Sequence, residues 1–142
     1  KGVLYEAKQE TQEVFSKEVM ADLTYALKGT ITGGTGAAAL ALGRPAAGKT
    51  GTSQSNASAW FSAYTPQLAA SVALFRDSAS ESLNGIGGLT SVTGGTFPAR
   101  IWTAFMKGAL KGEPVMDFPA PSNIGGLDPV VMTSGGKQKP KP

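Results

Sequence analysis

Two short apolar segments separated by a proline-containing turn place the tightest constraint on the fold of this chain. Residues 59–64 are rich in aromatic side chains, and residues 70–75 mix bulky apolar with small side chains. Both patterns are typical of strands that are buried on at least one face. Thr65-Pro66-Gln67 lies between them, and the proline ring presets the backbone torsion that a turn requires at its second position. We therefore expect a β-hairpin over residues 59–75.

An amphipathic segment before this hairpin predicts a helix over residues 16–28. Ser16 is a suitable N-cap, and Glu18 lies in the first turn, where a negative charge is favourable against the helix dipole. Lys28 and Gly29 close the segment. Its apolar residues fall on one helical stripe: Val19, Met20, Leu23, Ala26 and Leu27.

A second helix is expected after the hairpin, over residues 97–111. Pro98 is tolerated in a first turn, Ile101, Phe105 and Ala109 recur every four residues, and Gly112 follows the last turn. If residues 46–53 are also extended, three consecutive strands form an antiparallel meander. The fold class is then α+β, an antiparallel sheet covered by helices.

Composition limits both the size of the fold and its chemistry. A chain of 142 residues has room for one core, and the proline, glycine and lysine of residues 118–142 predict a disordered tail. The net charge of +3 comes from this tail, so we expect no nucleic-acid partner. Cysteine and histidine are absent, which argues against a metal site, and we expect no cofactor. No apolar run is long enough to span a membrane, so we expect no membrane contact by this segment.

Two motifs overlap at Lys49 and Thr50. Residues 43–50 match the letters of the phosphate-binding P-loop, G-x-x-x-x-G-K-[ST]. A P-loop follows a buried strand and leads into a helix, whereas an alanine-rich, helix-favouring stretch precedes this match and poor helix starters follow it. Nucleotide binding is therefore the weaker interpretation. Lys49-Thr50-Gly51 is also one of three signatures of the serine acyl-enzymes that attack penicillins and D-alanyl peptides.

The surrounding sequence favours the second motif. The segments GRPAAGKTGT, SAWFSAYTPQLAASVALFRD and GGTFPARIWTAFMKGAL closely resemble the C-terminal half of the transpeptidase domain of class A penicillin-binding proteins, the bifunctional cell-wall synthases, in an actinobacterial form. The resemblance covers residues 1–126, and its most specific parts are KTGT with the aromatic segment after it and the spacing to residues 98–102. It implies the penicillin-binding protein/serine β-lactamase-like transpeptidase fold. Residues 1–117 would be the C-terminal part of that domain.

The resemblance assigns roles to four residues. In such enzymes a serine attacks the D-Ala-D-Ala peptide bond of a peptidoglycan stem, and an amine from a neighbouring stem resolves the acyl-enzyme into a crosslink. Lys49 would place positive charge near the terminal carboxylate, and the hydroxyls of Thr50 and Thr52 would hydrogen-bond to it. Gly51 lets a ligand lie against the strand edge. The backbone N–H of Thr52 would be one of two oxyanion-hole donors.

The other two signatures of the family, Ser-x-x-Lys with the nucleophile and Ser-x-Asn, occur here only as coincidences of letters. Ser82-Leu83-Asn84 follows the hairpin, whereas the family's motif precedes the Lys-Thr-Gly. Ser134 and Lys137 are separated by two glycines, which disfavour the helix that this motif needs. We therefore expect the nucleophile to lie upstream of this chain and the chain alone to be inactive.

The resemblance also implies partners and a location. Stem peptides would be substrates, β-lactams inhibitors, and the upstream half of the same protein the structural partner. The location would be extracytoplasmic, in the cell envelope, with the parent protein anchored in the cytoplasmic membrane. Two alternatives remain open: a non-catalytic binding module of the same fold, and the P-loop nucleotide binder.

Overall fold

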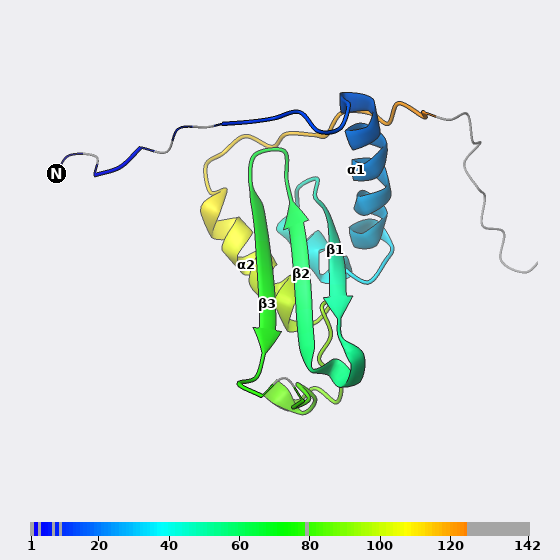
Figure 1. Cartoon of the computed structure of the whole chain (residues 1–142), viewed down its shortest axis with the longest axis vertical. Coiled ribbons are helices and arrows are strands. Elements are labelled where there is room, and N and C mark those ends of the chain that lie inside the picture. Colours follow the sequence, from blue (N-terminus) through cyan, green and yellow to red (C-terminus); the bar gives the residue numbers. More distant parts are fainter. Residues whose placement is uncertain (1, 3, 7, 9, 79, 125–142) are drawn as a thin grey trace, which may run out of the picture.

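The computed structural model describes residues 2, 4–6, 8, 10–78 and 80–124. Three strands form one antiparallel sheet, and two α-helices and three short 3₁₀ helices accompany it (Figure 1). In chain order the elements are α1 (Lys17–Thr32), η1 (Ala37–Leu42), β1 (Ala47–Thr52), η2 (Gln54–Asn56), β2 (Ser58–Tyr64), β3 (Ala69–Phe75), η3 (Ile86–Gly88) and α2 (Phe97–Ala109).

The sheet is the expected meander, with the strand order β1-β2-β3. Thr50 pairs with Phe61 and Phe61 pairs with Val72, so these three residues share one face. On β2, burial alternates strictly: Ala59, Phe61 and Ala63 are buried, whereas Trp60 and Ser62 are exposed. The period-two pattern therefore gives the sheet one buried face and one open face.

Helix α2 covers the buried face, and Trp102 fixes it there (Figure 1). The indole of Trp102 is fully buried and meets the Phe61 ring edge-on, with 5.4 Å between ring centroids. Its N–H donates to the carbonyl oxygens of Ala63 and Ala70, each at 3.1 Å, on two neighbouring strands. One side chain thus supplies apolar burial and satisfies a polar group in the same place.

Helix α1 packs against β1 (Figure 1). Ser16 caps it as expected, since its hydroxyl accepts from the Val19 N–H at 3.4 Å. The helix continues past Gly29 to Thr32, one turn beyond the expected end. The extra turn is stabilised by packing, because Ile31 near its end belongs to the main apolar core.

The chain that follows α2 turns back across the end of the sheet to reach α1 (Figure 1); we call residues 113–124 the return segment. The Phe118 ring meets the Tyr64 ring edge-on at 5.5 Å. The Asp22 carboxylate on α1 accepts the backbone N–H groups of Ser122, Asn123 and Ile124 at 2.6–2.9 Å. The predicted disordered tail begins at Phe118, and residues 118–124 make these contacts in the structure. The rest of the expected tail, residues 125–142, lies outside the described part of the chain.

The two tryptophans offer a matched test of this core. Trp102 is 0% exposed and Trp60, on the open face, is 46% exposed. We expect Trp102→Ala to lower the free energy of unfolding by about 3–5 kcal/mol, because it leaves a large cavity under α2. Trp60→Ala is expected to cost less than about 1 kcal/mol. Chemical denaturation of the two variants checks this, and equal losses would contradict the assignment of the core to the α2 face.

The hydrogen bonds from residues 122–124 to the Asp22 carboxylate, which we call the Asp22 cap, predict that protection of the return segment depends on pH. The backbone hydrogen bond from Ile124, with those from Asn123 and Ser122, lowers the pKa of the Asp22 carboxyl. A lowered pKa means that the cap is fully formed above the ordinary carboxyl pKa of about 3.9 and is lost as the pH falls through the lower, folded-state pKa. Amide hydrogen exchange at residues 122–124 should therefore show protection at pH 6 that disappears in strong acid. In Asp22→Asn the protection should be weaker and independent of pH; the same acid transition in that variant would contradict the cap.

Candidate functional site

All four residues of the Lys-Thr-Gly-Thr motif lie on β1, which is the outer strand of the described sheet. Gly48 lets this strand approach β2 closely, because a Cβ there would clash with Ala63. Lys49 and Thr50 therefore belong to a strand, and the next regular elements are the 3₁₀ turn η2 and the strand β2. A P-loop requires its lysine in a loop that leads into a helix, and this fold does not provide one here.

Along β1, the N–H and C=O groups of successive residues point alternately toward the neighbouring strand β2 and toward the open edge of the sheet. Just beyond β1, the Ser53 N–H donates to the Ser58 carbonyl at 3.0 Å, which makes this pair a hydrogen-bonded one. Since hydrogen-bonded and non-hydrogen-bonded pairs alternate in an antiparallel ladder, the N–H and C=O of Thr52 and of Thr50 point away from β2. The Lys49 Nζ donates to the outward carbonyl of Thr50 at 2.8 Å. The edge thus presents the outward N–H of Thr52, with the Lys49 ammonium group bonded to the Thr50 carbonyl beside it.

The side chains of the motif divide between the two faces of the sheet. Lys49 pairs with Ser62 on the open face. Thr50 and Thr52 lie on the opposite face, in register with the buried residues Phe61 and Ala59. The structure therefore brings the four residues together along one edge, with the ammonium on one side of it and the two hydroxyls on the other.

Two residues that the sequence did not single out contact these hydroxyls. The Thr35 hydroxyl lies 2.6 Å from the Thr50 hydroxyl, and the Gly94 N–H donates to the Thr52 hydroxyl at 3.2 Å. Thr35 belongs to the loop between α1 and η1, and Gly94 to the loop before α2. The only sequence signal for either was a short run of glycine and threonine, GGTG at residues 33–36 and TGGT at residues 93–96.

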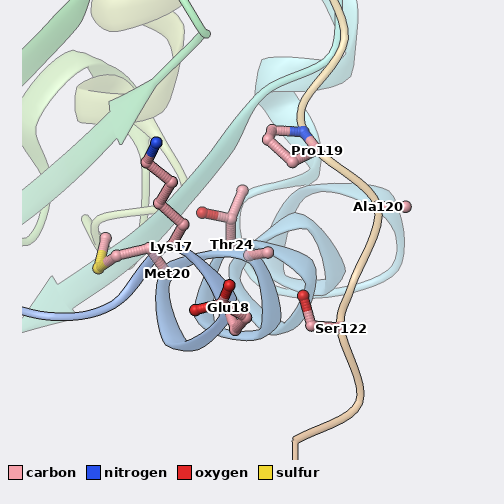
Figure 2. A pocket seen from close by; sticks show the side chains of 8 residues that line it. Lys17, Glu18, Met20, Thr24, Pro119, Ala120 and Ser122 are labelled. Carbon is pink, nitrogen blue, oxygen red and sulfur yellow. The ribbon is translucent and has the colours of Figure 1, made fainter.

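Two hollows on the surface differ in their relation to this edge. One, of about 530 Å³, lies over the open face of the sheet and includes Lys49, Ser62 and Ser71 in its wall. The other, of about 360 Å³, lies between α1 and the return segment, and Figure 2 shows Lys17, Met20, Thr24 and Pro119 around it. Only the first borders the Lys-Thr-Gly-Thr strand.

The Ser-x-Asn string has a structural role in the loop that follows β3. The Asn84 side-chain oxygen accepts from the Asn56 amide at 2.7 Å, Leu83 is buried, and the Arg76 side chain donates to the Ser82 carbonyl at 2.9 Å. These contacts anchor the loop to η2 and the end of the sheet. Ser134 and Lys137 lie outside the described residues.

Within the described residues, no cluster of three or more acidic side chains could hold a metal ion. The helices in the same part of the chain are also too short or too polar to cross a bilayer.

Comparison with known proteins places this geometry in a family. Residues 5–83, more than half of the chain, match the family model "Penicillin binding protein transpeptidase domain". Penicillin-binding protein 1A of Mycolicibacterium smegmatis is 37% identical over 131 residues, which are 87% of this chain and 16% of that protein. Penicillin-binding protein 1A of Rickettsia prowazekii is 33% identical over 123 residues, which are 87% of this chain and 15% of that protein. The chain thus spans about a sixth of the length of these relatives.

Solved structures agree with the sequence relatives. The penicillin-binding protein PonA1 from Mycobacterium tuberculosis superposes with a TM-score of 0.70 at 34% identity, over 88% of this chain and 34% of that one. Its complex with penicillin V gives a TM-score of 0.69 at 37% identity, over 78% of this chain and 30% of the other. The expected α+β fold and the expected family are both confirmed. The chain belongs to the penicillin-binding protein transpeptidase family, and it corresponds to part of the transpeptidase domain of a class A member.

Proposed function

We propose that β1 is the substrate-binding and oxyanion strand of a serine-type D,D-transpeptidase that crosslinks D-Ala-D-Ala stem peptides in peptidoglycan. The observation that carries this proposal is the edge of β1, which holds the outward N–H of Thr52, the Lys49 ammonium group and the hydroxyls of Thr50 and Thr52. An extended peptide can lie along such an edge as an added strand. Gly51 has no side chain to obstruct that approach.

Each group at the edge then has a defined task. When the nucleophilic serine of the complete domain attacks the carbonyl carbon of the scissile bond, negative charge develops on the carbonyl oxygen. The Thr52 N–H donates to that oxygen and stabilises it. The hydroxyls of Thr50 and Thr52 donate to the terminal carboxylate of the substrate, and Lys49 supplies positive charge near it. D-Ala leaves, and the acceptor amine releases the acyl group from the serine.

The partners follow from the same assignment. PonA1 has been solved in complex with penicillin V, which supports β-lactams as ligands of the complete domain, and the proposal places them at this edge. Stem peptides are the natural substrates in the proposal, and the remainder of the domain, with its nucleophile, is the structural partner. The activity belongs to an anchored protein of the cell envelope, with no nucleic acid and no membrane contact by this segment.

Substitution of Thr52 in the complete transpeptidase domain tests the oxyanion assignment. Thr52→Pro removes both the N–H and the hydroxyl, and proline is tolerated on an edge strand when its nitrogen faces outward. Thr52→Ala removes the hydroxyl alone and is the matched control. We expect Thr52→Pro to acylate with penicillin about 10²- to 10³-fold more slowly than Thr52→Ala, the loss that follows removal of one oxyanion donor. Equal acylation rates in two folded variants would exclude Thr52 as the donor.

The 142-residue chain alone should form no covalent adduct with penicillin. Among the described residues, Lys28 bonds to Asp117 and Lys49 to the Thr50 carbonyl, and no lysine ammonium group bonds to a serine hydroxyl. A serine without a basic partner is a weak nucleophile. Mass spectrometry after incubation with penicillin checks this: a stoichiometric adduct would contradict the placement of the nucleophile elsewhere. Failure of the complete domain to acylate would instead favour a non-catalytic binding module of the same fold.

A further inference from the structure

We propose that two loops preset the hydroxyls of Thr50 and Thr52 as hydrogen-bond donors toward the edge of β1, and that Thr35 is the positioning residue for Thr50. The inference rests on the proposed function, because it concerns how the same strand recognises a ligand carboxylate. It adds two groups that lie outside the Lys-Thr-Gly-Thr motif, the hydroxyl of Thr35 and the backbone N–H of Gly94.

The direction of the bond to Thr52 is fixed by its chemistry. A hydroxyl has one proton to donate and can accept two hydrogen bonds. The Gly94 backbone N–H can only donate, so the Thr52 oxygen is the acceptor in their 3.2 Å contact. The proton of Thr52 is therefore left for another acceptor, and the residue is exposed. A carboxylate at the edge is such an acceptor.

The bond to Thr50 can run in either direction until a ligand arrives. Thr35 and Thr50 are both hydroxyl residues, and their oxygens lie 2.6 Å apart. A ligand carboxylate has no proton and must receive one from Thr50, so Thr35 must then be the donor to the Thr50 oxygen. In this arrangement Thr35 orients the Thr50 proton toward the ligand without touching the ligand itself.

Close backbone packing holds both loops at the strand. A Cβ on Gly94 would clash with the Trp60 carbonyl and would lie 2.8 Å from the Gly51 oxygen. A Cβ on Gly95 would clash with the carbonyl oxygen of Thr35. The loop before α2 therefore packs against β1 and against the Thr35 loop at the same time. Only glycine allows this approach at either position.

The Thr35 loop is fixed from its other side as well. Gly36 is buried, its N–H donates to the Thr30 carbonyl at 2.9 Å, and a Cβ on it would lie 2.9 Å from the Phe61 ring. The main core thus supports this loop through Phe61. A hydroxyl held by such a loop keeps its direction, which reduces the ordering that ligand binding must supply.

The experiment compares Thr35→Val with Thr35→Ser in the complete transpeptidase domain, with penicillin G and its methyl ester as probes. The methyl ester has no carboxylate charge. We expect Thr35→Val to weaken the pre-covalent dissociation constant for penicillin G about fivefold to tenfold, the scale of one lost hydrogen bond, with the limiting acylation rate nearly unchanged. Thr35→Ser should restore wild-type binding. For the ester, wild type and Thr35→Val should behave alike.

Two results would overturn the inference. Wild-type affinity for penicillin G in Thr35→Val would show that the hydroxyl positions nothing. An equal loss for both probes would show a general structural effect rather than carboxylate recognition. Thr50→Val serves as the reference: if it loses the preference for the carboxylate and Thr35→Val does not, only the positioning role fails. If neither variant changes that preference, the proposed role of the strand in carboxylate recognition fails as well.

Discussion

The packing of Trp102 against the sheet is the interaction on which the rest of this structure depends. Its N–H donates to the carbonyls of two neighbouring strands and its ring meets Phe61 edge-on, and these contacts hold α2 against the buried face. The position of α2 fixes the loop that precedes it, and Gly94 and Gly95 in that loop pack against β1 and Thr35. In this way, the packing of the core also positions the loops that contact the Thr50 and Thr52 hydroxyls at the edge of the sheet.

Local patterns in the sequence were sufficient to predict the helices and strands, and the resemblance around Lys-Thr-Gly-Thr was sufficient to predict the family. The aromatic alternation of residues 59–64, the Thr65-Pro66-Gln67 turn and the N-cap at Ser16 act over short distances along the chain, and each formed where expected. The predicted apolar stripe of α1 was wrong, because Val19, Met20 and Leu23 are exposed and the helix buries Ala21, Thr24 and Ile31 instead. Helix α1 ends one turn later than predicted. The low helix propensity of Gly29 suggested an end there, but packing of Ile31 into the core stabilises one more turn.

The residues that contact the Lys-Thr-Gly-Thr strand could not be predicted from local sequence patterns. Thr52 and Gly94 are 42 residues apart, and their contact depends on the seating of α2, which no local pattern encodes. The division of Lys49 and the two hydroxyls between opposite faces follows from the strand period, but which face is buried depends on the register with β2. The order of residues 118–124 likewise depends on the carboxylate of Asp22, about one hundred residues earlier.

The central claim is that a ligand lies along the free edge of β1 with its reacting carbonyl at Thr52. A crystal structure of the complete transpeptidase domain acylated by a penicillin tests this most directly. We expect the acyl carbonyl oxygen about 2.7–3.1 Å from the Thr52 nitrogen, and the ligand carboxylate within hydrogen-bond distance of both threonine hydroxyls. An acyl group whose carbonyl oxygen points away from β1, or a carboxylate bound elsewhere, would contradict it.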